Sequence, residues 1–324
     1  MSSQPSNATL QAAAEWFSIL RADQATPQER QRWQAWLEAS EEHHTAWRYV
    51  QDLGQTFSVL REAPDPAVAT DKLLQANQRL HHRRQVLACI AGAVGAGVLG
   101  MLTWPRTSRL VLAWSADYHT ATGEQRQIVL TDGTHIWMNT STALNVDFTA
   151  SLRRIALAAG EVFVETGKDP ARPFVVDTNQ GRMRALGTRF NVRQQGDETL
   201  LAVYEGRVEV TPRDDGVPLV VQANQQVRFT RDRITQPTAA DPAREAWIAG
   251  LLIAHDVPLR EVVRELSRYR HGHIGVDEAI ANLRVYGSFP LGDTDRALVM
   301  LTTVLPVQVR QSLPWWMNIE ARPS

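Results

Sequence analysis

Residues 85–105, QVLACIAGAVGAGVLGMLTWP, contain no charged side chain and lie between Arg84 and Arg106. An α-helix of this length is about 31 Å long, enough to cross the hydrocarbon core of a bilayer. The many glycines and alanines leave a buried core helix as the alternative, but such a helix rarely continues for about six turns without a polar face. We therefore predict a transmembrane helix at residues 85–105.

Basic residues flank this segment unequally. Those before it are Lys72, Arg79, Arg83 and Arg84, and those soon after it are Arg106 and Arg109. The positive-inside rule then places residues 1–84 in the cytoplasm and residues 106–324 across the membrane. Arg83-Arg84 also resembles a twin-arginine export signal, here internal and uncleaved. The alternative is that the pair only sets the topology, and both interpretations stay open.

The amino-acid composition argues against several classes of function. The chain has 34 Lys and Arg against 35 Asp and Glu, so no net charge attracts it to nucleic acid, and we expect no direct nucleic-acid partner. Its single cysteine, Cys89, excludes an intrachain disulfide. The histidines at 43, 44, 271 and 273 have no acid or cysteine placed to complete a metal-ligand set. We expect no metal and no other cofactor.

Residues 7–60 are expected to form three helices. Thr26-Pro27-Gln28-Glu29 is a capping box with proline at the first helical position, and Asn7 and Ser40 are the expected caps of the other two helices. So short a segment buries only a small core, yet it contains four tryptophans, Trp16, Trp33, Trp36 and Trp47. Either most of them are core, or a partner completes one face, because aromatic residues dominate interface hot spots. No catalytic constellation is present, so we interpret this head as a binding module.

From residue 118 the hydrophobic period becomes the alternation typical of strands. Asp132-Gly133 predicts a hairpin between strands 127–131 and 134–138, and Ala159-Gly160 predicts one between strands 154–157 and 161–165. Further strands are expected at 174–178, 182–186, 189–193, 199–204, 207–211, 219–222 and 226–230. The pattern predicts an all-β sandwich or roll of roughly 120 residues.

The region from residue 247 is expected to be α+β. Its expected strands are 250–254, 274–276, 284–289 and 307–311, and its expected helices are 258–270 and 294–305. Residues 315–319 are expected to form a final edge strand that can accept a strand from a partner. These strand–helix–strand halves resemble the short N-terminal domain of secretins and TonB-dependent receptors.

Five blocks of the β-rich region carry a family resemblance: DGTHIWMNTSTALNV (132–146), RRIALAAGEVFVE (153–165), RPFVV (172–176), ALGTRFNV (185–192) and VYEGRVEV (203–210). In their order and spacing they look like the FecR domain of ferric-citrate-type sigma-factor regulators. The head, through AAEWFSILRAD and ERQRWQAWLEAS, resembles the N-terminal part of that family. The region from residue 247 resembles its C-terminal part, so the resemblance covers nearly the whole chain.

The resemblance implies an anti-sigma factor, a single-pass signal transducer in the inner membrane of a Gram-negative bacterium. Its head would bind an extracytoplasmic-function (ECF) sigma factor in the cytoplasm. Its periplasmic tail would receive a signal from the signalling domain of a TonB-dependent outer-membrane receptor for an iron siderophore. An intramembrane protease would act on the span, whose four glycines weaken the helix. The corresponding domains are 1–62 (head), 63–84 (linker), 85–105 (span), 106–240 (FecR domain) and 241–324 (α+β domain).

Candidate site residues follow from this interpretation. The sigma-binding candidates are Trp16, Trp33, Trp36 and Trp47, and the receptor-binding candidates are Trp315, Trp316 and Ile319. In some family members a Gly-Thr bond at the place of Gly187-Thr188 is where the protein cuts itself. The Thr188 hydroxyl would attack the Gly187 carbonyl, giving an ester that water opens. The alternative is an ordinary turn before a strand.

Two other function classes remain. One is a membrane-anchored periplasmic enzyme with a β-rich domain, and the other is a secretion-system adaptor. The β-rich region shows no nucleophile–base pair that would support an enzyme, and self-cleavage would be a single event without turnover. We therefore expect a regulator that is not an enzyme.

Overall fold

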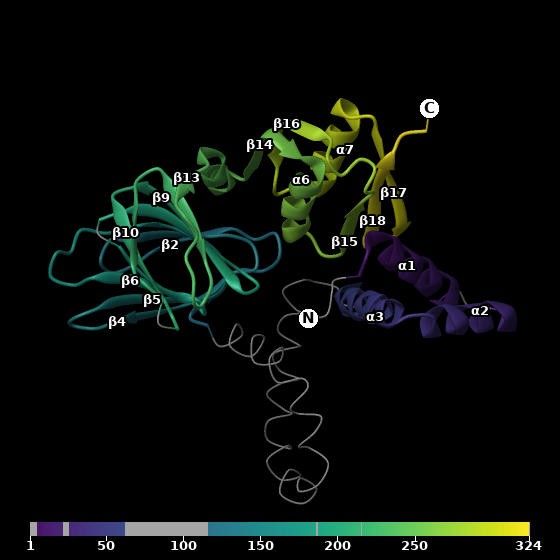
Figure 1. The fold of residues 1–324 in the computed structure, drawn as a ribbon, viewed down its shortest axis with the longest axis horizontal. Helices are drawn as coiled ribbons and strands as arrows, with labels where there is room; N and C mark the ends of the chain where they lie inside the picture. The colour runs from purple at the N-terminus through teal and green to yellow at the C-terminus, as the bar shows by residue number, and fades with distance from the viewer. Residues whose placement is uncertain (1–4, 22–25, 62–115, 186, 215, 324) are drawn as a thin grey trace, which may run out of the picture. The chain divides into compact units, whose positions relative to one another are not determined.

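The computed structural model describes residues 5–21, 26–61, 116–185, 187–214 and 216–323 (Figure 1). By its internal contacts the chain divides into two units. We call residues 105–271 and 283–305 the β unit, and residues 1–104, 272–282 and 306–324 the helical unit.

The β unit is built mostly from short strands that pair antiparallel. In chain order these are β1 (Tyr118–His119), β2 (Arg126–Val129), β3 (His135–Met138), β4 (Ala143–Phe148), β5 (Arg153–Glu165), β6 (Phe174–Asp177), β7 (Gly181–Ala185), β8 (Arg189–Gln195), β9 (Glu198–Glu205), β10 (Arg207–Pro212), β11 (Leu219–Gln222), β12 (Gln225–Phe229) and β13 (Thr238–Ala239). Their order is β11-β10-β7-β6-β5-β8-β9-β12-β13, with β3 and β4 also pairing with β5. The longest strand, β5, pairs parallel with β6. The predicted strands are therefore confirmed in place, with one exception.

The exception is the predicted hairpin at Ala159-Gly160, which is wrong. Residues 153–165 form one strand, β5, whose first half pairs with β4 and β6 and whose second half pairs with β3 and β8. Gly160 has φ +91°, and a Cβ there would lie 2.3 Å from Thr142 Oγ1. The glycine thus marks a bend at which the strand passes from one layer to the other, because only glycine fits both the backbone and the close approach.

The two layers enclose one apolar core. Buried side chains from the β2–β3 side, such as Ile136, and from the β4–β6 side, such as Ile155 and Phe174, belong to the same cluster. Phe190 and Val192 of β8 are fully buried in it. Along β7, β10 and the first half of β5, buried residues alternate with exposed or half-buried ones, which directs one face of each strand to this core.

Beyond β13, the β unit contains further helices and strands. A 3₁₀-helix (Pro242–Ala249) is followed by β14 (Leu251–Pro258), α6 (Leu259–Leu266) and a 3₁₀ turn (Ser267–Tyr269), and then by β16 (Arg284–Pro290) and α7 (Thr294–Val304). β14 pairs antiparallel with β16. The apolar face of α6 buries Leu259, Val262, Val263 and Leu266. The predicted strands and helices of this region are confirmed.

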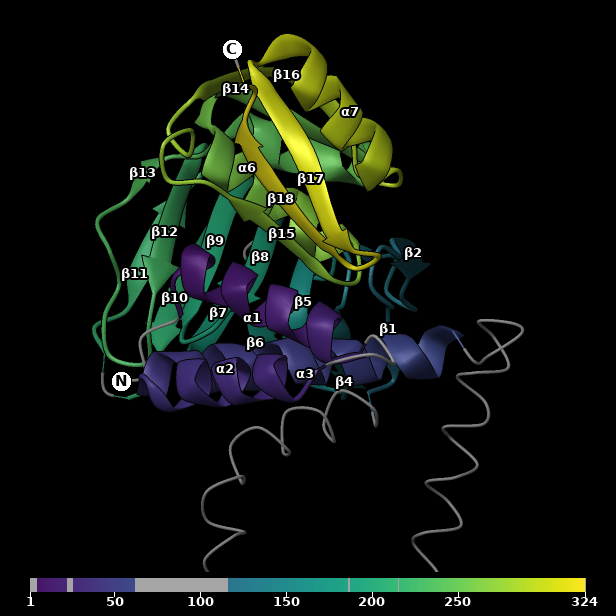
Figure 2. The ribbon, with the colours of Figure 1, turned by 90° about the vertical axis from the view of Figure 1, so that its right-hand side faces the viewer.

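The helical unit combines α1 (Asn7–Arg21), α2 (Pro27–Glu38) and α3 (Glu41–Arg61) with β15 (His273–Val276), β17 (Val307–Leu313) and β18 (Trp316–Ala321). Figure 2 shows α1 lying against α3, with β17 and β18 beside α1. The capping box at Thr26 and Glu29 is present, and Ser40 accepts the His43 N–H as predicted. At α1 the cap is Ser6 rather than Asn7, because the Thr9 N–H donates to Ser6 Oγ.

The predicted membrane architecture is corrected by the structure. Among the described residues, no helix is long and apolar enough to cross a membrane. α3 has the length, but it carries Glu41, Glu42, Arg48 and Asp52. The fold class with a transmembrane helix and the inner-membrane localisation are therefore wrong on this finding, which supports a mostly β chain with a small helical N-terminal region. The segment 85–105, its flanking Arg83-Arg84 and the expected intramembrane cleavage lie outside the described residues.

Candidate functional site

The predicted sigma-binding tryptophans lie on all three helices of the head and are half-buried. Trp33 of α2 and Trp47 of α3 approach with ring centroids 5.1 Å apart, and Phe17 of α1 lies 6.0 Å from Trp47. Trp36 instead stacks on His43, with centroids 4.4 Å apart. The structure thus brings Trp33 and Trp47 together and stacks Trp36 on His43, and Trp16 on α1 takes no part in these ring contacts.

Helix α2 is the least buried element of the head. None of its residues is fully buried, and Trp33, Trp36 and Leu37 are half-buried. The Trp33 Nε1 is itself enclosed and has no hydrogen-bond partner among the described residues. An enclosed donor without an acceptor costs free energy, so this part of the head is incompletely satisfied within the described chain.

The C-terminal candidates are placed differently from the prediction. Trp315, Trp316 and Ile319 are 5%, 1% and 0% exposed. β18 is the central strand of its sheet, parallel to β15 and antiparallel to β17, so the predicted edge strand is wrong. Strand order was missed because β15 and β18 pair across about 40 residues of intervening chain, which leaves no local signal.

Trp315 and Trp316 complete the core of the helical unit. They cluster with side chains of α1 and α3, namely Leu10, Ala13, Ala14, Ala46 and Val50. Phe17 and Trp315 make an edge-to-face contact at 5.7 Å. His273 stacks on Trp316 at 4.1 Å, and burial lowers the pKa of this histidine to about 4. A face of the head that the sequence assigned to a partner is thus partly filled by strands of the same chain.

Gly187-Thr188 lies directly before β8. Gly187 is exposed and has φ +75°, in the left-handed region that favours glycine. Thr188 is 5% exposed, and its Oγ1 is enclosed without a hydrogen-bond partner among the described residues. Gly206 packs against this peptide, since a Cβ at Gly206 would lie 2.2 Å from the Gly187 carbonyl oxygen. The bond therefore combines a glycine-only backbone with an uncommitted hydroxyl.

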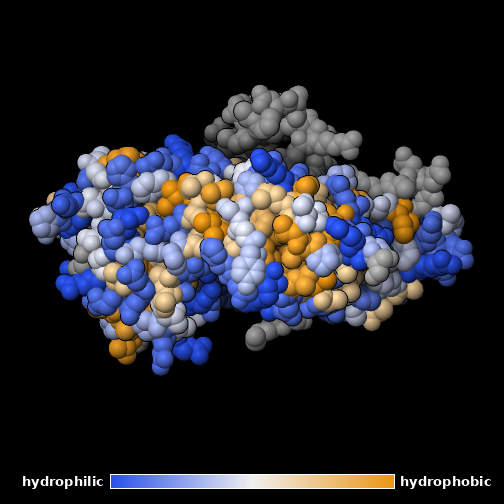
Figure 3. Space-filling model, turned by 90° about the horizontal axis from the view of Figure 1, so that it is seen from above, coloured by the Kyte–Doolittle hydropathy of each residue, from blue (hydrophilic) through white to orange (hydrophobic). Residues whose placement is uncertain are grey.

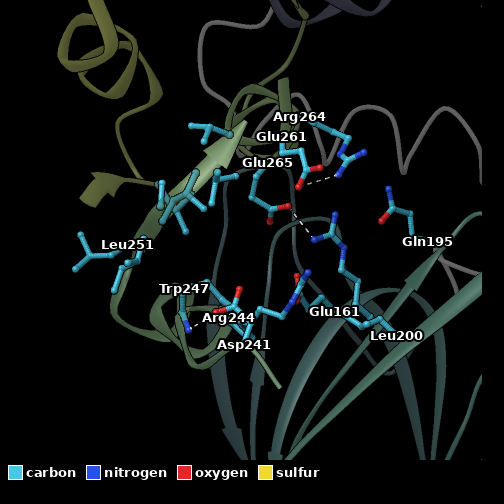
Figure 4. Close-up of a pocket in the computed structure, with 18 of the residues that line it drawn as sticks. Glu161, Gln195, Leu200, Asp241, Arg244, Trp247, Leu251, Glu261, Arg264 and Glu265 are labelled. Atoms are coloured by element: carbon cyan, nitrogen blue, oxygen red, sulfur yellow. Dashed lines mark hydrogen bonds and ion pairs between the residues drawn. The ribbon is translucent and has the colours of Figure 1, made fainter. Parts of the chain in front are cut away.

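A polar cavity of about 150 Å³ lies inside the β unit, next to α6 (Figure 4). At its wall the buried Glu161 carboxylate accepts hydrogen bonds from Asn139 Nδ2 and Asn191 Nδ2, each at 3.0 Å, and pairs with Arg268 at 2.8 Å. Arg193 pairs with Glu265 at 2.8 Å. Arg268 also pairs with Glu265.

These charges stabilise one another. Burial alone would lower the pKa of Arg268, but Glu161 and Glu265 outweigh it and raise the pKa. Burial would raise the pKa of Glu265, yet Arg268 and Arg193 lower it. Arg268 and Glu265 are therefore both charged near neutral pH, and each is committed to its partners. The ion pairs join α6 to the β-sheet and give each buried charge a partner, without which it would be costly. Because these groups are paired, the arrangement offers no free nucleophile or base.

Sequence reasoning missed this polar cluster. Its members come from the residue after β3, from β5 and β8, and from α6 and the 3₁₀ turn that follows it, more than a hundred residues apart at the extremes. The strand pattern gave no signal for it, because Glu161 and Asn191 alternate with the core residues Val162 and Phe190 and so lie on the face where polar residues are expected.

The outer surface offers less distinct features. Figure 3 shows hydrophilic residues over much of the visible face, with hydrophobic residues gathered in patches between them. Among the large exposed apolar side chains of the β unit are Tyr286 of β16 and Val299 and Val304 of α7. Within the described residues, no group of three or more His, Cys, Asp or Glu is arranged to hold a metal ion.

Comparison with known proteins finds two family matches. Residues 116–209 match the family described as FecR protein. Residues 11–53 match a family described as a domain of unknown function, DUF4880. The first match covers β1 to β9 and the first half of β10, and the second covers most of α1, all of α2 and the first part of α3. No curated protein matches the chain.

Solved structures share the fold. Two crystal structures, at 2.50 and 1.65 Å resolution, are of a protein from Parabacteroides distasonis ATCC 8503 described as a "putative anti-sigma factor". They align with TM-scores of 0.52 and 0.53 at 24% identity, covering 64% of this chain and 98% and 99% of theirs. At this identity the likeness concerns the fold alone.

Proposed function

From the chain's membership of the FecR family, we infer that it regulates a sigma factor, as a regulator rather than an enzyme. The observation that carries the inference is the presence of both family matches in one chain, a FecR domain preceded by a three-helix head. The description of the Parabacteroides distasonis protein supports it. The head is the binding module, because α2 carries half-buried aromatic side chains and no buried residue.

More specifically, we propose that the chain regulates an ECF sigma factor in response to a TonB-dependent siderophore receptor. We assign the receptor contact to residues 241–324 and the sigma contact to residues 1–62, following the family resemblance. Because Trp315, Trp316 and Ile319 are buried, a receptor strand would first meet an outer strand of the β15-β18-β17 sheet, such as β17. The candidate tryptophans then act by supporting this sheet.

The test uses the purified full chain and a candidate ECF sigma factor from the same organism. In a transcription assay with RNA polymerase, the full chain should change transcription from the sigma-dependent promoter, and a chain lacking residues 1–61 should not. Transcription that responds equally to both chains would contradict the assignment of sigma binding to the head.

A second candidate function is self-cleavage at Gly187-Thr188, and the unpartnered Thr188 Oγ1 favours it. Gly187 is exposed and left-handed, a backbone that glycine adopts without strain, and its carbonyl oxygen packs against Gly206. Wild type should give two fragments on a denaturing gel, whereas Thr188→Ala should give one band. Intact wild type, or an alanine variant that is cut equally well, would contradict this proposal.

A further inference from the structure

Thr166 brackets the peptide groups on both sides of Thr188. The Thr188 N–H, which belongs to the Gly187-Thr188 bond, donates to Thr166 Oγ1 at 2.9 Å. The Thr188 carbonyl oxygen accepts from the Thr166 N–H at 3.1 Å and from its hydroxyl at 3.3 Å. A side-chain oxygen is therefore fixed at the nitrogen that would leave if this bond were cut.

Thr166 is itself held in place by its neighbour. The Gly167 N–H donates to Thr134 Oγ1 at 2.9 Å, and the Gly167 carbonyl accepts from Arg153 at 3.0 Å. Arg153 pairs with Asp132 at 2.7 Å, with side chains 5% and 2% exposed. A Cβ at Gly167 would lie 2.2 Å from the Asp132 carbonyl oxygen. The buried ion pair thus sets the position of Thr166.

We propose that Thr166 is a positioning residue for cleavage of the Gly187-Thr188 bond; this rests on the self-cleavage proposed above. Thr188 Oγ1 forms a bond to the Gly187 carbonyl carbon, its proton passes to the Thr188 nitrogen, and the carbon–nitrogen bond breaks. The product is an ester with a free Thr188 amine. Water then hydrolyses the ester to a Gly187 carboxyl group and a Thr188 hydroxyl.

The role of Thr166 follows from the geometry of this step. The nitrogen must leave the peptide plane as its bond to carbon breaks. The hydrogen bond to Thr166 Oγ1 persists when the amide becomes an amine, so it orients the nitrogen throughout. Small losses of orientation near reacting atoms are costly, on the order of a hundredfold in rate for about 1 Å.

The test follows cleavage of the full chain from synthesis. The chain is made by pulse-labelled cell-free translation, chased, and resolved on a denaturing gel. Thr166→Val, which keeps the shape but removes the hydroxyl, should slow fragment formation about tenfold or more. Thr166→Ala, a second variant without the hydroxyl, should be slowed similarly. Thr166→Ser, the matched control, keeps the oxygen and should stay within about threefold of wild type.

Hydroxylamine separates the two steps, because it opens esters much faster than amides. If Thr166 acts on ester formation, Thr166→Val stays slow when hydroxylamine is added, and that result supports the proposal. Recovery of the wild-type rate with hydroxylamine would place Thr166 in ester hydrolysis and overturn it. Equal slowing of Thr166→Ser and Thr166→Val would overturn it as well, since the hydroxyl would not be the cause.

The two proposals fail separately. If wild type stays intact, self-cleavage is wrong and Thr166 has no such role. If wild type is cut and Thr166→Val and Thr166→Ala are cut at the same rate, only the role of Thr166 is wrong.

Discussion

The β unit and the helical head are stabilised in different ways. The β unit encloses a continuous core with fully buried Phe174, Phe190 and Phe229. The buried side chains that the described head contributes are Leu10, Ala13, Ala14, Ala46 and Val50, three of which are alanine. Trp315 and Trp316 supply the large side chains of that second cluster.

The difference indicates which region is adapted to bind. Burial of a large apolar side chain stabilises by about 1.5–3 kcal/mol, whereas alanine contributes little. The β unit is therefore stable through its own packing, and the head depends on added surface. A region with a small core and half-buried aromatic side chains gains most from a partner, which agrees with sigma binding through α2.

The largest expected effect is a cavity in the β unit. Phe190→Ala should lower its free energy of unfolding by about 3–5 kcal/mol, because it removes a fully buried ring from close packing. Urea unfolding of the full chain measures this. Val129→Ala, at a side chain 60% exposed on β2, is the control and should change it by less than about 0.5 kcal/mol. Equal losses would mean that the core described here does not carry the stability.

A slightly smaller effect is expected at the buried Asp132–Arg153 pair. Arg153→Ala leaves the Asp132 carboxylate buried without its cation and should cost about 3 kcal/mol. Its neighbour Arg154 pairs with Asp177 but is 37% exposed, so Arg154→Ala should cost about 1 kcal/mol or less. If the two variants unfold at the same urea concentration, burial does not distinguish these pairs.

The same pair predicts acid sensitivity. Burial raises the pKa of Asp132, but hydrogen bonds from Thr134 and Arg153 outweigh it and lower the pKa below 3.8. The ionised form therefore stabilises the fold above pH 3.8, and this stability is lost as pH falls through the lower folded-state pKa. Asp132→Asn should flatten stability against pH in that acid range, as followed by urea midpoints. An unchanged pH dependence in this variant would show that Asp132 is not responsible.

The smallest of these effects belongs to the head. Thr26→Ala removes the capping box of α2 and should destabilise the helix by about 1 kcal/mol. Thr45→Ala, inside α3 where the hydroxyl donates to Glu41 O and accepts from Arg48, is the control. Hydrogen exchange of α2 amides should increase in the first variant and stay unchanged in the second. No increase in the first would mean that packing, not the cap, holds α2.

Local signals predicted most elements. Asp132-Gly133 correctly predicted the turn between β2 and β3, and the Thr26 capping box correctly predicted the start of α2. Both signals depend on interactions made within a few residues. Ala159-Gly160 gave the same kind of signal but marks a bend in β5, because the reason for the glycine is Thr142, the residue just before β4. Local chemistry does not distinguish a hairpin glycine from a glycine that another strand approaches.

Pairing between residues far apart in the chain could not be predicted from the sequence. The central place of β18 depends on pairing with β15, and the cluster of Glu161 and Arg268 joins β5 to the end of α6. The Gly187-Thr188 bond was found by its motif, but its support by Thr166 appears only when β5 and β8 lie side by side.

The central claim is that the head binds the sigma factor through α2. The direct measurement is the affinity of the full chain for its ECF sigma factor, by calorimetry, for wild type, the double variant Trp33→Ala with Trp36→Ala, and the control Trp137→Ala. Trp137 is a half-buried tryptophan of the β unit, on β3. We predict that the double variant, still helical by circular dichroism, loses at least about a hundredfold in affinity, while Trp137→Ala binds as wild type. Wild-type affinity in a folded double variant would contradict the claim.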